Sequence, residues 1–327
     1  MKEISIQDFC EENNLSYLSN YLNNEALNYC EFKQIYVDTE MHSVVTNDFC
    51  IFENFERFKN PKKYREKFLY NSKVIQEKIK LSKIISGPSF YFGGENNYWH
   101  LLKDFIPKLN ILHKENNQKN INLLINSNLS DNYFEILNFF LKKLKLNNLH
   151  ILKLNDGFYK CNKVVISACP TIKYSVNFYD QLIVNDLERK DVGKNFYISR
   201  NLASKRKIVN ENEIINMLEK YNYDIIYCEK LSFEEQIKTF SHAKNIIAPQ
   251  GAGLTNIFWS QKSVNVLELS SQAIQPFFHL LAHVKCINFF RIVGKDDHSH
   301  SYEKANHRDY FINKNLLEDT IVKYKLY

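Results

Sequence analysis

In the second half of the chain, short apolar runs alternate with longer segments in which apolar residues recur every three to four positions. Strands that alternate with helices build a parallel sheet with helices on both faces. The pattern therefore predicts a doubly wound parallel α/β domain, whose last helix could pack on either domain of the chain. The predicted strands are residues 195–199, 224–227, 245–248, 265–269 and 287–292, and the predicted helices are residues 211–221, 233–243, 254–259, 275–284 and 316–324.

Two of these helices begin with a capping-box pattern, in which Asn or Ser is followed three residues later by Glu. The pairs are Asn210 with Glu213 and Ser232 with Glu235. We expect these side chains to satisfy the first free amides of their helices.

The first half of the chain has a weaker pattern, an αβαβ succession. It predicts helices at residues 97–114 and 131–146, and strands at 120–125, 150–154 and 163–168. Residues 1–85 carry only short apolar segments such as 34–37 and a basic, aromatic helical stretch near 61–80. We predict two domains, residues 1–180 and 181–327, with the linker near 174–193, where periodicity fades.

Composition and charge narrow the class of protein. The chain has 327 residues, 44% hydrophobic, with 43 Lys and Arg against 37 Asp and Glu, which excludes disordered and fibrous classes. The net charge of +6 is mild, so no nucleic-acid partner is expected, whereas a polyanionic small molecule or an anionic membrane surface is compatible with it. No apolar run approaches the ~18 residues of a membrane span, and no signal peptide is recognisable at the start. Seven scattered cysteines without a CxxC pair indicate a reducing compartment, so we expect a cytoplasmic location.

A glycine turn follows one of the predicted strands. The run Ile246–Asn256 passes from a buried strand through Gly251, Ala252 and Gly253 into a helix start. Such a turn lets backbone approach a ligand closely, and free amides at a helix start favour an anion such as a diphosphate. At the end of the next strand, Glu268 is placed to accept hydrogen bonds from ribose hydroxyls.

Two other interpretations of the turn stay open. A lone Gly-Ala-Gly can merely allow a tight strand-to-helix connection. A nicotinamide-binding fingerprint would need a third glycine where Asn256 stands and should open the first βα unit of its domain. The nucleotide-sugar interpretation is therefore favoured over a dehydrogenase.

Basic residues follow the first predicted strand of the same half. Arg200 ends that strand, and Arg206 lies in the loop behind it. Because the carboxyl ends of parallel strands meet at one edge of a sheet, we expect both guanidinium groups to reach the anion at Gly251. Arginine suits a diphosphate because its planar fork binds two oxygens together.

The run Asp296-Asp297-His298-Ser299-His300 has residue types that bind divalent cations. Polar runs between elements are more often solvated loops. We therefore predict no required metal, and a contact of this loop with donor base or acceptor is the second alternative.

Several linked motifs resemble glycosyltransferase family 61. They are residues 196–200, Arg206, 210–211, 231–237, Ala243, 246–256 and Glu268, in the order and spacing of that family's C-terminal signature. The resemblance is strong over residues 194–270 and weaker at 97–109 and 307–317. It implies a GT-B fold, in which two Rossmann-like domains with parallel sheets face each other across a cleft. It also implies an inverting transfer from a nucleotide sugar.

For individual residues, the resemblance implies a diphosphate site with the glycine turn as its cradle, Arg200 and Arg206 as phosphate ligands and Glu268 on the ribose. The cradle residues are Gln250, Gly251, Ala252, Gly253, Leu254 and Thr255. The family usually has His where this chain has Gln250. Glutamine donates a hydrogen bond but cannot carry a proton, so an acid role at this position is in question.

An inverting transfer also needs a base that deprotonates the acceptor hydroxyl. Residues 93–107 resemble the family's N-terminal motif, in which an aromatic residue and His precede Asp. His100 and Asp104 are four positions apart and so share one helix face. Either could be the base, Glu95 is the reserve candidate, and an ordinary core role for the histidine is the plain alternative.

The resemblance and the residues together predict a metal-independent, inverting hexosyl- or pentosyltransferase without a cofactor. Its donor is expected to be UDP-linked and bound by residues 181–327, while residues 1–180 serve the glycan acceptor. The expected role is surface polysaccharide synthesis, capsule or lipopolysaccharide, at the inner face of the membrane. The alternatives are a non-catalytic sugar-nucleotide-binding partner of another transferase and a nucleotide-dependent oxidoreductase. The donor sugar, the linkage and the oligomeric state are not readable from the sequence.

Overall fold

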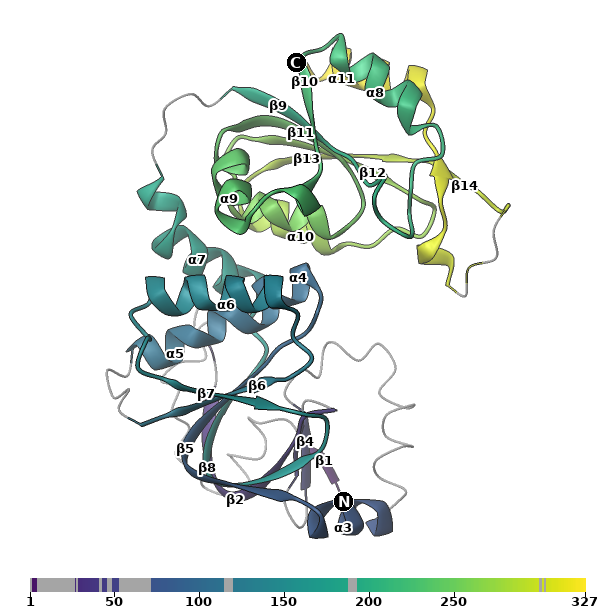
Figure 1. Ribbon diagram of the computed structural model, residues 1–327. Coiled ribbons are helices and arrows are strands. Elements are labelled where there is room, and N and C mark those ends of the chain that lie inside the picture. The colour runs from purple at the N-terminus through teal and green to yellow at the C-terminus, as the bar shows by residue number, and fades with distance from the viewer. Residues whose placement is uncertain are drawn as a thin grey trace. The chain divides into compact units, whose positions relative to one another are not determined.

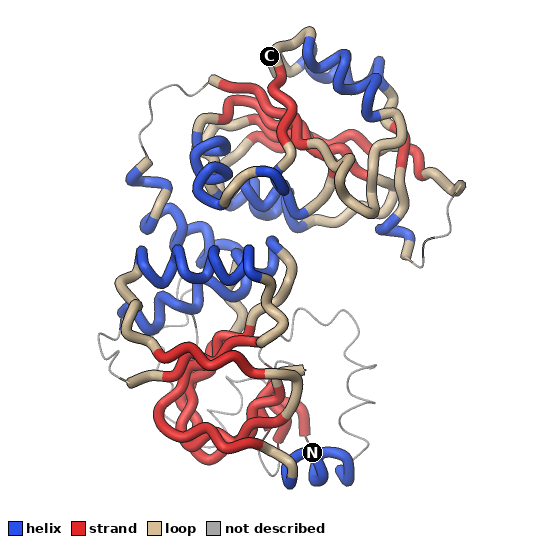
Figure 2. Tube along the Cα trace, viewed as in Figure 1, coloured by secondary structure: helices blue, strands red, loops and turns tan. Residues whose placement is uncertain are grey.

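The computed structural model divides into two compact units, Met1–Ser175 and Val176–Tyr327. It describes residues 2–4, 27, 29–40, 43–45, 49–52, 72–114, 120–187, 193–299, 302 and 304–327. Figures 1 and 2 show that each unit contains its own sheet with helices packed on it. Among the described residues, no helix has the length and apolar character needed to cross a bilayer.

The first unit is built on an eight-stranded mixed sheet of order β1-β4-β3-β2-β8-β5-β6-β7. Its strands are β1 (Lys2–Ile4), β2 (Tyr29–Asp38), β3 (Ser43–Val45), β4 (Phe49–Phe52), β5 (Lys83–Gly93), β6 (Asn122–Asn126), β7 (His150–Leu154) and β8 (Phe158–Ser167). The adjoining strands β8, β5, β6 and β7 are parallel. However, β2 runs antiparallel to β8 and to β3. The expectation of a parallel, Rossmann-like sheet is therefore confirmed for these four strands and wrong for the sheet as a whole.

The predicted helix at residues 97–114 is helical throughout but changes its winding. It consists of α4 (Tyr98–His100), a π-helical turn η2 (Leu101–Phe105), a 3₁₀ turn η3 (Ile106–Lys108) and α5 (Leu109–Lys114). Pro107 has no amide hydrogen to donate and its ring crowds the preceding turn, which accounts for the break in the α-helical ladder. The Ile106 amide instead bonds the Leu101 carbonyl, and this wider turn carries Asp104.

Other helices of this unit are α3 (Ser72–Lys80) and α6 (Asp131–Lys143). The predicted helical stretch near residues 61–80 is described only from Ser72 onwards. Figure 1 shows α4, α5 and α6 on one side of β6 and β7. The Phe92 and Phe105 rings, 5.8 Å apart, pack the π turn against the end of β5.

The second unit confirms the doubly wound parallel domain. The five strands of its main sheet are all parallel, in the order β10-β9-β11-β12-β13, and a separate antiparallel pair joins β14 (Lys295–Asp296) to β15 (Tyr310–Phe311). The parallel strands are β9 (Lys194–Ile198), β10 (Tyr223–Ile226), β11 (Ala243–Pro249), β12 (Asn265–Ser270) and β13 (Asn288–Val293). The helices are α8 (Glu211–Glu219), α9 (Phe233–Ser241), the 3₁₀ helix η6 (Ala252–Phe258), α10 (Phe277–Val284) and α11 (Lys314–Lys323). Figure 1 shows α8 and α11 over one face of the sheet and α9 and α10 over the other.

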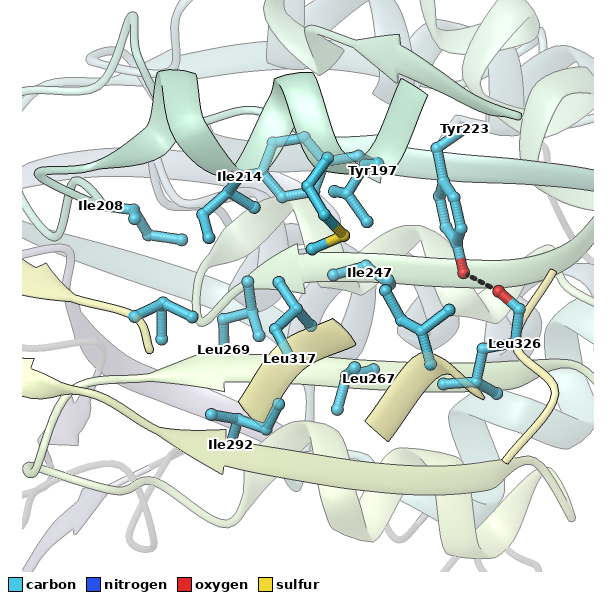
Figure 3. Close-up of a cluster of buried hydrophobic side chains, with 14 of the residues drawn as sticks. Tyr197, Ile208, Ile214, Tyr223, Ile247, Leu267, Leu269, Ile292, Leu317 and Leu326 are labelled. Carbon is cyan, nitrogen blue, oxygen red and sulfur yellow. Dashed lines mark hydrogen bonds between the residues drawn. The ribbon is translucent and has the colours of Figure 1, made fainter. Parts of the chain in front are cut away.

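One hydrophobic core of this unit lies between the sheet and the helices α8 and α11 (Figure 3). Leu317 and Ile321 of the last helix belong to it, so that helix packs on its own unit. Tyr223 also donates to the Leu326 carbonyl at 2.6 Å, which fixes the end of the chain against β10. Burying each such aliphatic side chain contributes about 1.5–3 kcal/mol to the free energy of folding. On the opposite face, Phe196 packs on Phe240 of α9, because neighbouring residues of a strand point to opposite faces.

A ladder of asparagine side chains crosses the amino ends of four adjoining strands. Asn245 donates to Asn195 at 2.8 Å, Asn265 donates to Asn245 at 2.8 Å, and Asn288 donates to Asn265 at 2.9 Å. Asn195 in turn donates to the Tyr221 carbonyl at 3.4 Å. Each buried amide is thus paired with the next strand, which fixes the register of the sheet.

Two local predictions need correction. The capping box at Ser232 and Glu235 is confirmed, but Asn210 makes no side-chain cap. Its amide instead exchanges hydrogen bonds with the backbone of Ile312, which pulls it away from the helix start. The predicted linker also begins inside a helix, α7 (Ile172–Leu182), which packs Tyr179 against Phe258 and Trp259.

Candidate functional site

The glycine turn and the first arginine lie together at the carboxyl edge of the second sheet. Strands β9 and β11 are neighbours, with Tyr197 opposite Ile247, so Arg200 and Gly251 follow adjacent strand ends. Gly251 has extended backbone angles, φ 174° and ψ 175°, which any residue can adopt. The absence of a side chain at this position matters because a methyl group would overlap the Arg200 guanidinium, whose Cζ would be 2.8 Å away. The predicted meeting of these two groups is thus present in the structure.

Arg200 and Arg206 are half-buried cations with incomplete hydrogen bonding. Arg200 Nη2 donates to the Lys205 carbonyl at 3.1 Å. No described residue accepts a hydrogen bond from Nε of Arg200 or of Arg206. Burial lowers the pKa of both guanidinium groups, and the nearby charge of Arg200 lowers the pKa of Arg206 further. Two partly desolvated cations that repel each other and have unused hydrogen-bond donors are chemically suited to an anion.

Residues 307–309 hold the loop that carries Arg206. The Arg206 amide donates to the His307 carbonyl at 3.3 Å, and the Lys207 backbone amide donates to the Asp309 carboxylate at 2.8 Å. Arg206 has a left-handed backbone, φ 58°, which these contacts maintain. Tyr310 is fully buried and donates to the Leu269 carbonyl at 2.6 Å. Sequence reasoning assigned no role to these residues, and the only signal for them was the weaker family resemblance at 307–317.

The remaining cradle residues differ in how far they are exposed to solvent. Ala252 and Gly253 are partly exposed, whereas Leu254 and Thr255 are fully buried. The Leu254 amide closes a turn onto the Gly251 carbonyl at 3.0 Å, so it already has an acceptor. The predicted helix is a 3₁₀ helix of seven residues, too short for the macrodipole of an α-helix to contribute much. The two arginines therefore carry the case for an anion, and the helix start adds little.

Gln250 and Glu268 lie beneath the turn. Gln250 is 2% exposed and its side-chain amide donates to the Gln275 carbonyl at 3.4 Å. Glu268 is fully buried inside β12, two residues before the strand ends, and its carboxylate pairs with Arg291 Nε at 2.5 Å. Burial raises the pKa of the Glu268 carboxyl, and Arg291 opposes that shift. The structure thus places Glu268 in an internal ion pair, and its role on a ribose stays a prediction.

In the first unit, His100 and Asp104 form a hydrogen-bonded pair. His100 Nδ1 lies 2.7 Å from Asp104 Oδ2, so the predicted shared face exists despite the π turn between them. Asp104 Oδ1 accepts from Lys103 Nζ at 2.9 Å and from the Cys169 thiol at 3.0 Å. The Asp104 side chain is 3% exposed and that of His100 is 27% exposed. Only the imidazole of this pair is open to a substrate.

Burial acts on the pKa values of several side chains near this pair. Burial alone would lower the pKa of Lys103, but Asp104 and Cys169 raise that pKa overall. Burial, reinforced by Asp104, raises the pKa of the Cys169 thiol to about 12. Lys108, missed by sequence reasoning, is fully buried with its amine 4.7 Å from the Phe105 ring centre, and burial lowers its pKa to about 7.

The reserve base, Glu95, lies in the loop between β5 and α4 and is half-buried. The same loop is tied down by Asn97, whose side chain caps α4 by accepting from the His100 amide at 3.3 Å. Asn126, at the carboxyl end of β6, donates to the Gly94 carbonyl at 3.2 Å. The predicted residues Glu95, His100 and Asp104 thus follow the carboxyl end of one parallel strand, where ligands of open α/β sheets bind.

No three described His, Cys, Asp or Glu residues come together as metal ligands. In the loop that could have bound a cation, Asp296 accepts from the Gln272 amide at 2.8 Å and pairs with Arg308 at 3.5 Å. Asp297 accepts from the Ser299 hydroxyl at 2.7 Å, and His300 lies outside the described residues. The described acids of this loop are thus engaged by other groups of the protein.

One family model covers both the His100–Asp104 pair and the arginine site. The family model Glycosyltransferase 61 matches residues 98–267 of the chain. The matched region includes His100, Asp104, Arg200, Arg206 and the Gly251 turn. No curated protein matches the chain.

Proposed function

The chain belongs to glycosyltransferase family 61 and is thus a glycosyltransferase, and from this premise we propose that it transfers its sugar from a nucleotide-diphosphate donor with inversion. The expected donor is UDP-linked and the expected acceptor is a glycan of a surface polysaccharide, capsule or lipopolysaccharide. The GT-B architecture, the hexosyl or pentosyl specificity and the site of action at the inner face of a membrane are part of the proposal and rest on the resemblance.

The observation that carries the donor proposal is the contact between Arg200 and Gly251. The guanidinium lies against the turn, where a methyl group at residue 251 would displace it, and Arg206 lies in the same loop. A diphosphate placed there would pair with the two guanidinium groups, whose buried Nε atoms lack an acceptor among the described residues. It would also cancel the repulsion between the two cations, and the same contacts would stabilise the charge on the departing diphosphate.

The pair of His100 and Asp104 supports an inverting mechanism. In such a transfer one base takes the proton of the acceptor hydroxyl as its oxygen attacks the anomeric carbon from the face opposite the leaving group. An imidazole whose Nδ1 hydrogen bonds a carboxylate keeps its lone pair on Nε2, which suits this task.

A metal is not needed for this charge balance, because two guanidinium groups do the work that a divalent cation does in other transferases. We expect transfer activity to be unchanged in excess EDTA. A loss of activity that added Mg²⁺ or Mn²⁺ restores would contradict the arginine-based mechanism.

The test is calorimetric titration with UDP, GDP, CDP and NAD, followed by product assays with a panel of sugar nucleotides. We expect one nucleoside diphosphate to bind, and Arg200→Ala to lower transfer about 10²–10³-fold, the typical effect of removing one charge-stabilising donor. The exposed Lys220→Ala, which removes the same charge, is the control. Binding of NAD alone would overturn the proposal. Diphosphate binding without transfer or donor hydrolysis would instead support a non-catalytic sugar-nucleotide-binding role.

A further inference from the structure

The carboxylate of Asp104 is enclosed on both of its oxygens. One oxygen accepts from His100, and the other accepts from Lys103 and from Cys169. Lys103 Nζ also contacts the Cys169 sulfur at 3.4 Å, so these groups form one closed cluster. The Lys103 backbone is fixed in turn, because Ser175 donates to its carbonyl at 2.8 Å.

This enclosure separates the roles of the two candidate bases. Three donors stabilise the charged form of a carboxylate and leave it a poor proton acceptor. The carboxylate is also almost completely shielded from solvent, whereas more than a quarter of the His100 side chain is exposed. A base must reach the proton it removes, and of these two residues only the histidine does so.

We propose that His100 is the base of the transfer and that Lys103 and Cys169 are positioning residues that hold Asp104 so that it orients the imidazole. This inference rests on the proposed function. In the step, the acceptor O–H bond breaks and its proton passes to His100 Nε2. The acceptor oxygen forms the new bond to the anomeric carbon, and the bond to the diphosphate breaks with its electron pair leaving on the phosphate oxygen.

The chemistry of the two positioning residues fits this role. The cation of Lys103 offsets the charge of Asp104 and holds the carboxylate in the place from which it orients the imidazole. The Cys169 thiol keeps its hydrogen at any assay pH, because burial raises its pKa to about 12, and it therefore stays a donor. Lys108 is the other charged group that acts on Cys169, and it stands on the same helical run as Asp104.

The experiment compares Lys103→Met, Cys169→Ala and Cys169→Ser with the wild type. We expect Lys103→Met to lower kcat about tenfold, the low end for loss of a group that orients a catalytic ligand. Cys169→Ala should lower kcat about threefold, the effect of one modest hydrogen bond, and Cys169→Ser should restore it.

The controls are Lys114→Met and Cys286→Ser, which change exposed residues of the same types and should leave kcat unchanged. Donor affinity should stay at the wild-type value in all variants. A purely structural role would lower stability while kcat of the folded enzyme stays at the wild-type value, and that result would overturn the proposal. So would Glu95→Gln abolishing transfer while His100→Gln retains it.

A second measurement does not depend on turnover. The ¹⁵N shifts of the His100 ring should report hydrogen on Nδ1 in the wild type and a mixture of tautomers in Lys103→Met. A wild-type ring protonated on Nε2 alone would overturn the positioning proposal even if the enzyme transfers sugar. Conversely, the expected tautomer in a chain that binds no sugar nucleotide would contradict the proposed function and leave the cluster's geometry correct.

Discussion

The two groups of functional residues differ in how completely their charges are satisfied. In the second unit, Arg200 and Arg206 are partly desolvated and their Nε atoms have no acceptor among the described residues. In the first unit, Asp104 accepts three hydrogen bonds and lies in a closed cluster. The contrast indicates two functions. We propose that an anion completes the arginine region, whereas the His100 region already has the geometry proposed for catalysis.

The largest expected effect comes from filling the space that the Arg200 guanidinium occupies. Gly251→Ala should displace that group and weaken donor binding about hundredfold, the value of one or two charge-assisted hydrogen bonds. Calorimetric titration with the nucleoside diphosphate measures it. Gly193→Ala is the matched control, because a methyl group there would meet nothing within 4 Å. Equal affinities in the two variants would remove the steric argument for the Arg200 contact.

A smaller effect, on stability alone, is expected from the buried amine beside the first site. Burial lowers the pKa of Lys108 to about 7 in the folded state, against about 10.4 when unfolded. Between these values the unfolded chain binds more protons, so this group makes stability rise with pH from about 7 to about 10. Lys108→Met should be more stable than the wild type at pH 7. Its advantage should shrink by at most about 1.4 kcal/mol per pH unit as the pH rises.

Denaturant unfolding at several pH values measures this effect, with the exposed Lys114→Met as the control. Parallel stability curves for Lys108→Met and the wild type would show that the Lys108 amine is charged in the folded protein. The first site would then lie in a more polar environment than its contacts indicate.

The smallest expected effect concerns the scaffold under the arginine site. Asn245→Ala breaks the asparagine ladder in its middle and leaves the buried Asn195 oxygen without its donor and the half-buried Asn265 amide without its acceptor. We expect a loss of about 2 kcal/mol in the free energy of unfolding and unchanged donor affinity at 25 °C. Asn288→Ala, at the exposed end of the ladder, should cost less. Equal losses for both variants would contradict a cooperative ladder.

The fold of the second unit was predictable because its strands and helices alternate along the chain and pair with near neighbours. The same reasoning could not foresee that β2 would lie antiparallel to β8, because Tyr29 pairs with Ser167 far along the sequence. Short apolar segments in residues 1–85 give no sign of such distant partners. The pattern therefore predicted the parallel strands β6, β7 and β8 and missed the parallel strand β5 and the antiparallel part of the first sheet.

At the site, the parallel-sheet rule predicted that Arg200 would meet Gly251, since both follow adjacent strand ends. The same rule placed Glu268 at an open strand end, but its side chain is buried and paired with Arg291. The position of a residue along a strand does not reveal how deeply its side chain is covered. The contacts of Lys103 with Cys169 were also beyond prediction, since they depend on how a helix packs over the end of β8. Individual partners thus required the structure.

The central claim, that Arg200 and Arg206 hold a diphosphate, is tested most directly by observing their side chains. The ¹H–¹⁵N signals of the two Nε groups, assigned with Arg200→Lys and Arg206→Lys, can be followed while UDP is added. We predict that both signals move together and saturate at the affinity measured by calorimetry, and that uridine moves neither. Saturable binding of UDP with both signals unmoved would contradict the account.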